Sequence, residues 1–279
     1  MFAKSIRNRE NNMKRKNKCK FKIKMSEKKR QYIFVIKQLT GREIKRKYAR
    51  SYLGIMWSVL GPLLNMIVMS LIFSYMFKKS IENFPVYYLT GQIIYALFNT
   101  ATSHAMTALV DNKNLIIKSK LSKQTFVLSR IYTAFVNFLY TLIPYVGILI
   151  FFRIKVSFKA LLFIPDIFLI TVFATGVGYI LATIYVFFAD IKHLYSIFMT
   201  IIMYMSAIFY PAERLPGFMQ EILSFNPVYL AIDIARYSVV YNLYPYYTEW
   251  IKLVVYAIAA FVIGVFVYRK NENKMMMEI

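Results

Sequence analysis

Few residues in the apolar body of this 279-residue sequence carry side chains suited to covalent or metal chemistry. The two histidines, His104 and His193, lie far apart, and no cysteine or carboxylate cluster accompanies them at the spacing of a metal site. Asp190 and His193 are spaced i,i+3, which a turn between two helices explains. Asp166, beside Pro165, is the only carboxylate within a long apolar segment. Its place near the segment's end favours a helix-cap or gate residue over a proton relay.

The sequence also lacks the motifs by which proteins bind nucleotides or attack carbonyl groups. No G-x-x-x-x-G-K-[ST] phosphate loop occurs, so we expect no ATP hydrolysis by this chain itself. No G-x-S-x-G nucleophile elbow is present. The single cysteine, Cys19, cannot form an internal disulfide. We therefore expect neither an enzyme nor a self-powered pump, and no cofactor in this chain.

Aromatic side chains are abundant, with 24 Phe, 23 Tyr and 2 Trp. Most of them are expected to form interfacial belts or to fill gaps between helices. Some tyrosines, however, fall well within apolar segments, where a buried phenol needs a hydrogen-bond partner. Flat rings with a hydroxyl edge suit the faces of sugars. Our hypothesis is that four aromatic residues line a passage for a glycan: Trp57, Tyr75, Tyr95 and Tyr204.

The elements that hold these residues are predicted to be membrane-spanning helices. The chain is 58% hydrophobic and 18% charged with a mean hydropathy of +0.47, whereas soluble domains are about 45–50% apolar and 25% charged. A helix of about 20 apolar residues crosses the bilayer core. Six segments meet that test and predict an all-α integral membrane protein: residues 53–77, 84–110, 125–152, 160–189, 194–210 and 250–268.

The charges predict the orientation of these helices. Lys and Arg number 36 against 13 acids, and residues 1–50 hold 19 of the basic residues. The apolar body favours lipid rather than nucleic acid as the partner of this charge. A cytosolic N-terminus places 27 Lys and Arg inside and 8 outside, which obeys the positive-inside rule. We expect a multi-pass protein of the cell membrane with both termini cytosolic, a disordered basic tail over residues 1–30 and a cytosolic tail over 271–279.

Residues 31–52 predict an amphipathic helix that lies in the cytosolic headgroup plane. Apolar residues recur in it at helical spacing, and the polar positions include Arg42, Lys45, Arg46 and Lys47. Two interpretations remain open: plain anchoring to anionic lipid, and a docking surface for a cytosolic partner.

The segment Asp111–Lys123 is the largest cytosolic loop between two predicted spans. Asp111 and Asn112 are candidate N-caps of a short helix. Leu115, Ile116 and Ile117 offer an apolar face that a bare connecting loop would not need. We therefore expect a helix here that presses on a partner.

Residues 210–249 are too apolar for a free external loop, and prolines at 211, 216, 227 and 245 divide them into pieces too short to span. Asn226-Pro227 predicts a helix start, with Asn as the cap and Pro at the first position. The helix that follows, Val228–Val240, would pair Asp233 with Arg236. Non-helical backbone at membrane depth must face protein or water. These pieces are thus expected to line or cover an outer opening.

Small residues repeat on one face of two predicted spans, which lets helices pack closely. They are Ala174, Gly178 and Ala182 in the fourth span and Ala260 and Gly264 in the sixth.

Four stretches resemble the ABC-2 type permeases that export O-antigen, capsule and teichoic acid. Residues 44–64 (IKRKYARSYLGIMWSVLGPLL) are similar to that family's basic helix and G-x-x-W-x-x-x-x-P-L entry to the first span. Residues 188–194 (FADIKHL) are similar to its F-R-D-I-x-H-L turn, with Ala189 in place of the arginine. Residues 114–129 and 210–236 (Y-P…L-P…N-P…R) match the cytosolic loop and the stretch before the last span.

The resemblance implies a homodimer in which each chain, with one ABC transmembrane domain over residues 53–270, binds a cytosolic ATPase that holds ATP and Mg. A lipid-linked glycan would pass between the two permeases. The residues implied for coupling to the ATPase are Asp111, Asn114, Leu115, Ile116, Ile117 and Lys118, beside an interface helix with Arg42, Lys45, Arg46 and Lys47. An outer gate would contain Tyr210, Pro211, Pro216, Asn226, Pro227 and Arg236, and Asp190 and His193 would form the turn between spans four and five.

Three alternatives stay open. An ABC-2 exporter of a drug or small lipid shares the six spans but usually lacks the basic front helix and the turn. A membrane glycosyltransferase or acyltransferase needs converging acids or histidines, and only Asp190 and His193 qualify. An ion-coupled carrier would rest on Asp166 alone.

Overall fold

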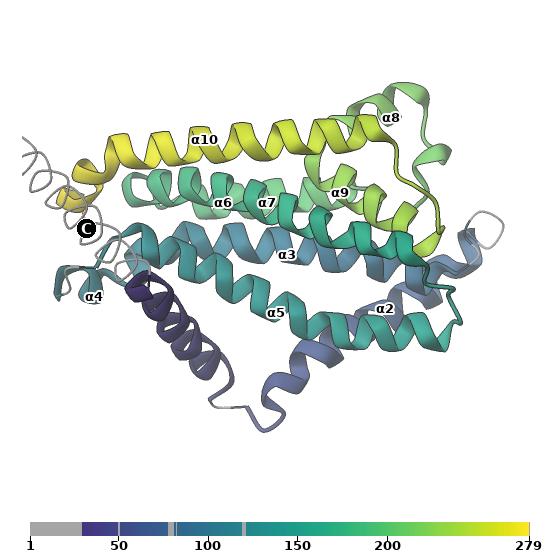
Figure 1. The fold of residues 1–279 in the computed structure, drawn as a ribbon, viewed down its shortest axis with the longest axis horizontal. Helices are drawn as coiled ribbons and strands as arrows, with labels where there is room; N and C mark the ends of the chain where they lie inside the picture. The colour runs from purple at the N-terminus through teal and green to yellow at the C-terminus, as the bar shows by residue number, and fades with distance from the viewer. Residues whose placement is uncertain (1–29, 50, 78–80, 82, 119–120, 279) are drawn as a thin grey trace, which may run out of the picture.

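The computed structural model describes residues 30–49, 51–77, 81, 83–118 and 121–278, and within these residues the chain is all-helical, without strands (Figure 1). The predicted basic tail lies outside the described residues except for Arg30. The helices form an elongated bundle. We call its two ends the α4 end and the α8 end, after the short helices that lie there.

The helix predicted over residues 31–52 is present over residues 30–48 and ends four residues earlier than expected. It is followed by a turn, the short helix η1 (Gly54–Met56) and α2 (Trp57–Phe77). Gly54 has a φ of +49°, which a glycine adopts without steric cost, and this residue lies where the chain reverses. The hydroxyls of Tyr48 and Ser58 are hydrogen-bonded across the reversal. The N-terminal helix and α2 therefore diverge from this point as the two arms of a V beside the bundle (Figure 1).

Four helices are long and apolar enough to cross a membrane: α3 (Phe84–Asp111), α5 (Gln124–Phe151), the run Phe158–Phe187 that comprises η2 (Phe158–Leu162) and α6 (Phe163–Phe187), and α10 (Tyr247–Glu278). The apolar part of α2 and the helix α7 (Ile191–Tyr204) are shorter. α7 ends six residues before the predicted span does, because residues 205–210 form a turn. α10 continues past the predicted span through residues 271–278, so the predicted cytosolic tail is helical over these residues.

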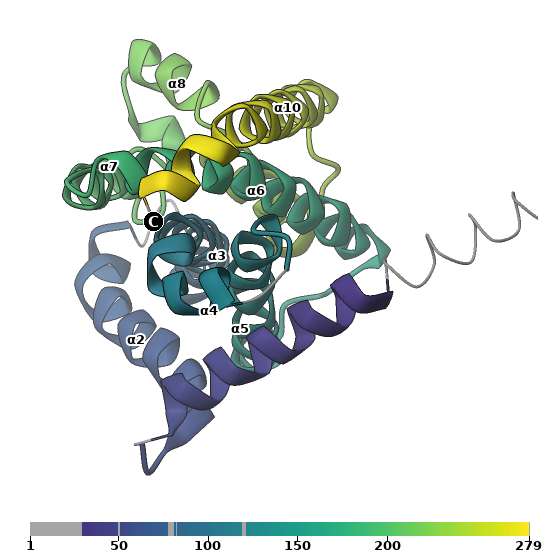
Figure 2. The same ribbon diagram turned by 90° about the vertical axis from the view of Figure 1, so that its left-hand side faces the viewer.

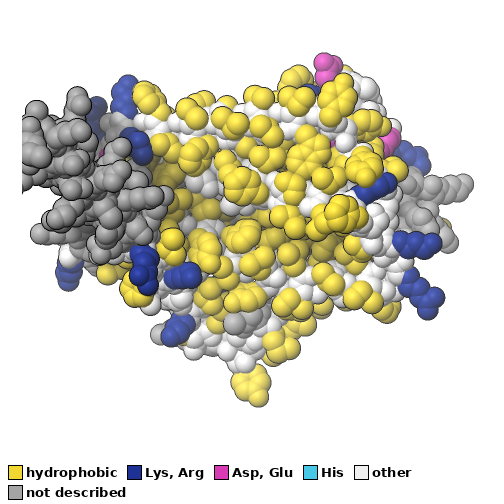
Figure 3. Space-filling model, in the orientation of Figure 1, with side chains coloured by type: hydrophobic (Ala, Val, Ile, Leu, Met, Phe, Trp, Pro, Cys, Tyr) yellow, Lys and Arg dark blue, Asp and Glu magenta, His cyan; other side chains and the backbone are white. Residues whose placement is uncertain are grey.

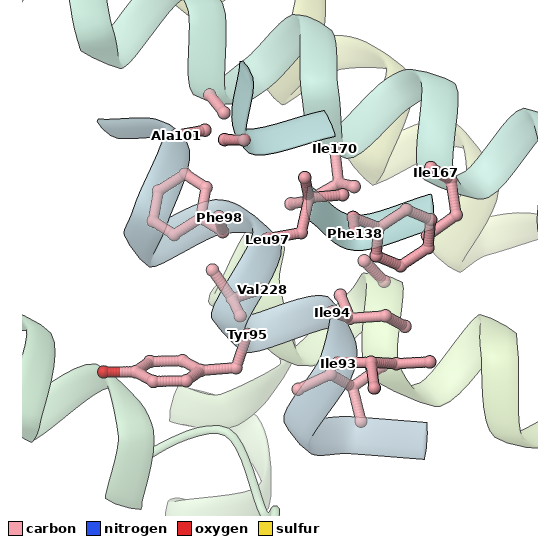
Figure 4. Packing of buried hydrophobic residues seen from close by; sticks show 14 of the residues in the cluster. Ile93, Ile94, Tyr95, Leu97, Phe98, Ala101, Phe138, Ile167, Ile170 and Val228 are labelled. Carbon is pink, nitrogen blue, oxygen red and sulfur yellow. The ribbon is translucent and has the colours of Figure 1, made fainter. Parts of the chain in front are cut away.

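α3 is the central helix, and it packs against α2, α5, α6, α7 and α9 (Pro227–Ala235). Figure 4 shows Ile94 and Leu97 of α3 close to Phe138 of α5 and Ile170 of α6, and all four are buried. Lipid tails are as apolar as these side chains, so close packing rather than the hydrophobic effect holds the helices together.

Small residues make the contacts between α6 and its neighbours, as the sequence predicts. Ala174, Gly178 and Ala182 are buried, and a Cβ on Gly178 would lie 2.8 Å from the Cβ of Ala105 on α3. On another side of α6, Gly176 meets the backbone of α10 at Ala260. Neither backbone has room for a larger residue there.

The surface between the two ends of the bundle is largely apolar, whereas Lys and Arg side chains gather at the ends (Figure 3). The exposed apolar side chains belong to long helices that a membrane would surround, including Leu71 of α2, Ile150 of α5 and Phe266 of α10. A water-soluble monomer rarely exposes so large an apolar area.

Candidate functional site

The α4 end carries the predicted partner-binding helix, α4 (Lys113–Lys118). Ile116 is buried at 5% exposure, whereas Leu115 and Ile117 are 39% and 64% exposed. The three aliphatic residues therefore do not share one exposed face. Ile116 anchors α4 to the bundle, and Leu115 and Ile117 present an apolar surface flanked by Lys113 and Lys118.

The predicted capping of α4 by side chains is wrong. The backbone carbonyl of Asn112 accepts from Leu115 N (2.9 Å) and Ile116 N (3.0 Å). Its side-chain amide instead donates to Ala108 O (2.8 Å), and its Oδ1 accepts from Arg42 Nη2 (2.6 Å). Asn112 thus ties α3 to the N-terminal helix.

Arg130 of α5 joins three helices at this end. Its Nη1 donates to Glu43 Oε2 of the N-terminal helix at 2.7 Å, and its Nη2 to Asp111 Oδ2 of α3 at 3.1 Å. The Arg130 and Glu43 side chains are only 12% and 11% exposed, so their ion pair is partly shielded from water. Thr40 adds a buried bond from its hydroxyl to Ser129 O. The N-terminal helix is therefore fixed to α5 by specific contacts as well as by any lipid around it.

Of the predicted interface residues, Arg42 hydrogen-bonds to Asn112 and also pairs with Glu43 at 3.1 Å. Lys45, Arg46 and Lys47 are exposed.

A polar groove runs along α3 and α7 (cavity volume about 400 Å³). α3 contributes Asn99, Ser103 and Thr107, and α7 contributes Lys192, Ser196 and Thr200. Both sets are spaced i,i+4,i+8, so each forms a stripe along one helix face. Polar side chains within apolar helices normally face a protein interior or a water-filled path. We call this surface the α3/α7 groove.

The turn between α6 and α7 is built from backbone, as its spacing predicts. His193 N donates to Asp190 O at 3.0 Å, and the side chains of both residues are exposed. Among the described residues, no three His, Cys, Asp or Glu side chains are placed to hold a metal ion.

At the α8 end, the predicted helix start is confirmed. Asn226 Oδ1 accepts from Val228 N at 3.0 Å, and Pro227 is the first residue of α9. The Asn226 amide also donates to Met205 O (2.9 Å) and Ser206 Oγ (3.0 Å), in the turn after α7. Of the other predicted gate residues, Pro211 is buried in that region, Pro216 precedes α8 (Gly217–Ser224), and the Tyr210 hydroxyl donates to Tyr204 O.

The predicted pair of Asp233 and Arg236 is wrong. α9 passes into a π-helical turn, η4 (Arg236–Val240), and Arg236 is 1% exposed, with its guanidinium turned toward α3. Arg236 Nη1 donates to the Tyr87 hydroxyl (2.9 Å) and Ala207 O (3.0 Å). Burial raises the pKa of the Asp233 carboxyl, although the nearby Arg236 charge acts in the opposite direction.

Asp166, in the first turn of α6, is fully buried, and neither carboxylate oxygen has a hydrogen-bond partner among the described residues. The interpretation of Asp166 as a helix cap is therefore wrong.

The model of the ABC-2 type transporter family matches residues 35–240, from the N-terminal helix to the end of η4. The chain belongs to the ABC-2 type transporter family. It is accordingly a membrane protein.

Curated relatives of this ABC-2 chain include the O-antigen export system permease protein RfbA of Myxococcus xanthus, 28% identical over 66% of this chain and 71% of that protein. RfbA of Klebsiella pneumoniae is 26% identical over 71% and 77% of the two chains. The polysialic acid transport protein KpsM of Escherichia coli is 21% identical over 84% and 92%.

Within this ABC-2 chain, the four aromatic residues of our passage hypothesis do not meet. Tyr95 is buried and lines the α3/α7 groove, and its hydroxyl donates to Met199 O of α7 at 2.8 Å (Figure 4). Trp57, Tyr75 and Tyr204 are 51%, 87% and 57% exposed on the outside of α2 and α7. Sequence reasoning missed the polar stripes of the groove, whose signal was the four-residue repeat of polar residues along two apolar segments.

Proposed function

We propose that this chain is the permease subunit of an ATP-driven exporter that moves a lipid-linked polysaccharide or polyol-phosphate polymer out across the cell membrane. O-antigen, capsule and teichoic acid are the polymer classes we consider. The names of its relatives, two O-antigen export permeases and a polysialic acid transporter, support this class. The observation that carries the proposal is the α3/α7 groove, a polar path along two apolar helices that suits a hydroxyl-rich cargo.

We infer six spans, with α2 and α7 crossing beside the four long helices. The α4 end then lies in the cytosol with both termini, and the α8 end lies outside. The pieces between α7 and α10 would act as the outer gate, since α8 and α9 are too short to cross and the buried Arg236 ties them to α3.

A second copy of this chain would close the groove into a channel. α2 and α7 lie on either side of α3, which carries the groove (Figure 2). Both helices expose apolar side chains, such as Leu71 and Ile201. Tyr75, Trp57 and Tyr204 are also exposed on these two helices, so a homodimer would bring them toward the path.

Power would come from a separate cytosolic ATPase that holds ATP and Mg. α4 is the element suited to receive its motion, because Leu115 and Ile117 are exposed beside Asn114, Lys113 and Lys118, while Ile116 and Asn112 fasten α4 to the bundle. Closure of the ATPase pair would push α4 and open the path along α3.

The test is purification of the tagged chain from its native membranes with an assay of vanadate-sensitive ATPase activity. We expect a stoichiometric ATPase whose retention falls at least tenfold in the Leu115→Ser/Ile117→Ser variant. Lys270→Ala, at an exposed lysine of α10, is the control that leaves this apolar surface unchanged. A chain that purifies alone and still transports or transfers a glycan would overturn the proposal.

The groove is tested separately. Thr200→Leu fills it and is expected to abolish glycan export while the ATPase stays bound. Thr171→Leu on α6 is the matched control, because within the described part of the chain both hydroxyls bond to their own helix, to Ser196 O and Ile167 O. Equal export by the two variants would contradict the path.

A further inference from the structure

A second polar cavity, of about 580 Å³, lies between the N-terminal helix, α3 and α5 near the α4 end. Its walls include Arg46 and Lys47 of the N-terminal helix, His104 of α3, and Arg130 and Asn137 of α5. A cavity of this volume is far larger than a single water molecule needs, and its lining is too polar to remain dry. We call it the Asn137 cavity.

Asn137 shows that the cavity is built for a polar occupant. The residue is 8% exposed, yet neither its amide nitrogen nor its amide oxygen has a hydrogen-bond partner among the described residues. Thr133, one turn earlier on α5, does not supply this partner, because its hydroxyl is hydrogen-bonded to Ser129 O and Thr40 Oγ1. Buried amides are nearly always satisfied, so the partner of Asn137 has to come from the cavity.

The charges on the walls favour an anion. Both acids that line the cavity, Glu43 and Asp111, are already paired with Arg130. Arg46 and Lys47 form no ion pair with any described residue, and Arg130 Nε is buried without a hydrogen-bond partner. A phosphate oxygen is a good acceptor for these donors.

The cavity continues into an apolar crevice of about 160 Å³ between α2, α3 and α5. The crevice shares Lys47 and Asn137 with the cavity, and its deeper walls include Pro62, Leu97 and Phe138. An occupant of both spaces is therefore amphipathic, with an anionic head at the charged side and a hydrocarbon chain in the crevice.

We propose that the Asn137 cavity binds the phosphate headgroup of a membrane lipid, with the start of its chain in the adjoining crevice. The inference extends the proposed function and rests on it for the cargo, because a lipid-linked glycan carries such a phosphate. A bulk anionic phospholipid offers the same chemistry, so the experiment separates the two sources.

The experiment measures binding of two probes, undecaprenyl diphosphate and phosphatidylglycerol, to the purified full chain by native mass spectrometry. We expect the Arg46→Gln/Lys47→Gln variant to weaken binding about thirtyfold, at about 1 kcal/mol for each of the two basic residues lost. Asn137→Leu should weaken binding several-fold and leave Tm unchanged, since the amide has no hydrogen-bond partner to lose among the described residues. Lys45→Gln is the matched control, because Lys45 lies on the same exposed helix but not on the cavity wall.

Weaker binding of undecaprenyl diphosphate alone by these variants supports a site for the lipid-linked cargo. Binding of both lipids that is weakened to the same extent supports a phosphate headgroup site filled by bulk lipid. The proposal is overturned if neither variant binds either lipid more weakly than Lys45→Gln does, or if Asn137→Leu only lowers Tm. Because binding is measured without ATPase or transport, that failure would leave the export role standing.

Discussion

The guanidinium carbon of Arg236 lies 3.5 Å from the centroid of the Tyr87 ring. The same guanidinium donates to the Tyr87 hydroxyl and to two carbonyls of the turn after α7, Ala207 O and Ile208 O. Tyr87 in turn donates to Tyr210 O at 2.8 Å. One buried arginine thus connects η4, α3 and the turn after α7, and its stacking on a desolvated ring is worth about 2 kcal/mol.

Replacing Arg236 with methionine should destabilise the protein by about 3 kcal/mol, because several buried carbonyls and a hydroxyl lose their donor. Thermal unfolding in detergent measures the effect as a lower Tm. Lys155→Met, at an exposed lysine near the same end, should leave Tm unchanged. Equal Tm values for the two variants would show that Arg236 is not structural.

Gly91→Ala should lower Tm for a related reason. A Cβ on Gly91 would lie 2.9 Å from Arg236 Nη2, and the guanidinium is held by its hydrogen bonds. Gly147→Ala on α5 is the matched control, since its added Cβ meets nothing within 4 Å. That control should be neutral or slightly stabilising, because alanine favours a helix by about 1 kcal/mol over glycine. A Gly91→Ala protein as stable as Gly147→Ala would contradict the close approach.

Arg130→Gln should loosen the N-terminal helix, since Glu43 and Asp111 lose their shared partner and Glu43 is partly buried. We expect amide hydrogen exchange over residues 30–48 to accelerate at least tenfold. Lys37→Gln, an exposed change on the same helix, is the control. The double variant Glu43→Gln/Arg130→Gln should recover part of the protection, because it also removes the Glu43 carboxylate, which Arg130→Gln leaves with Arg42 as its ion-pair partner. Unchanged exchange in Arg130→Gln would show that the ion pairs are dispensable.

Asp233→Asn should raise Tm at pH 7.5. Burial raises the pKa of Asp233 in the folded chain, so the stability that its neutral form contributes is full at low pH and is lost as pH rises through the folded value. The asparagine variant lacks this carboxyl, so its loss is smaller and comes from other groups such as Glu249, which hydrogen-bonds to Asp233. The gain in Tm should therefore shrink as the pH is lowered, and a gain that is absent at pH 7.5 or grows toward low pH would contradict the raised pKa.

Features with a local cause were predicted from sequence. The helix start at Asn226-Pro227 depends on one side chain and its next two residues, and it forms as expected. The amphipathic helix over residues 30–48 and the long apolar helices follow from the residues within each segment. The turn at Asp190 and His193 is likewise made by neighbouring backbone groups.

Features that depend on distant partners were mistaken. Arg236 was expected to pair with Asp233, three residues earlier, but Tyr87, 149 residues away in sequence, offers it a ring and a hydroxyl. Asn112 was expected to cap α4, but Arg42 of the N-terminal helix takes its side-chain oxygen. In both cases the side chain makes hydrogen bonds to a distant part of the chain in place of the predicted local contact, because several partners surround one buried group.

The sequence by itself determined that this chain is a helical membrane protein of a recognisable family, since the transfer of each segment into lipid depends on that segment's own composition. Only the tertiary structure decided which helix faces meet. The polar stripes of α3 and α7 become a groove because the two helices lie side by side. Asn137 becomes part of a cavity because the N-terminal helix folds back onto α5. Packing, and not the composition of any one segment, sets those neighbours.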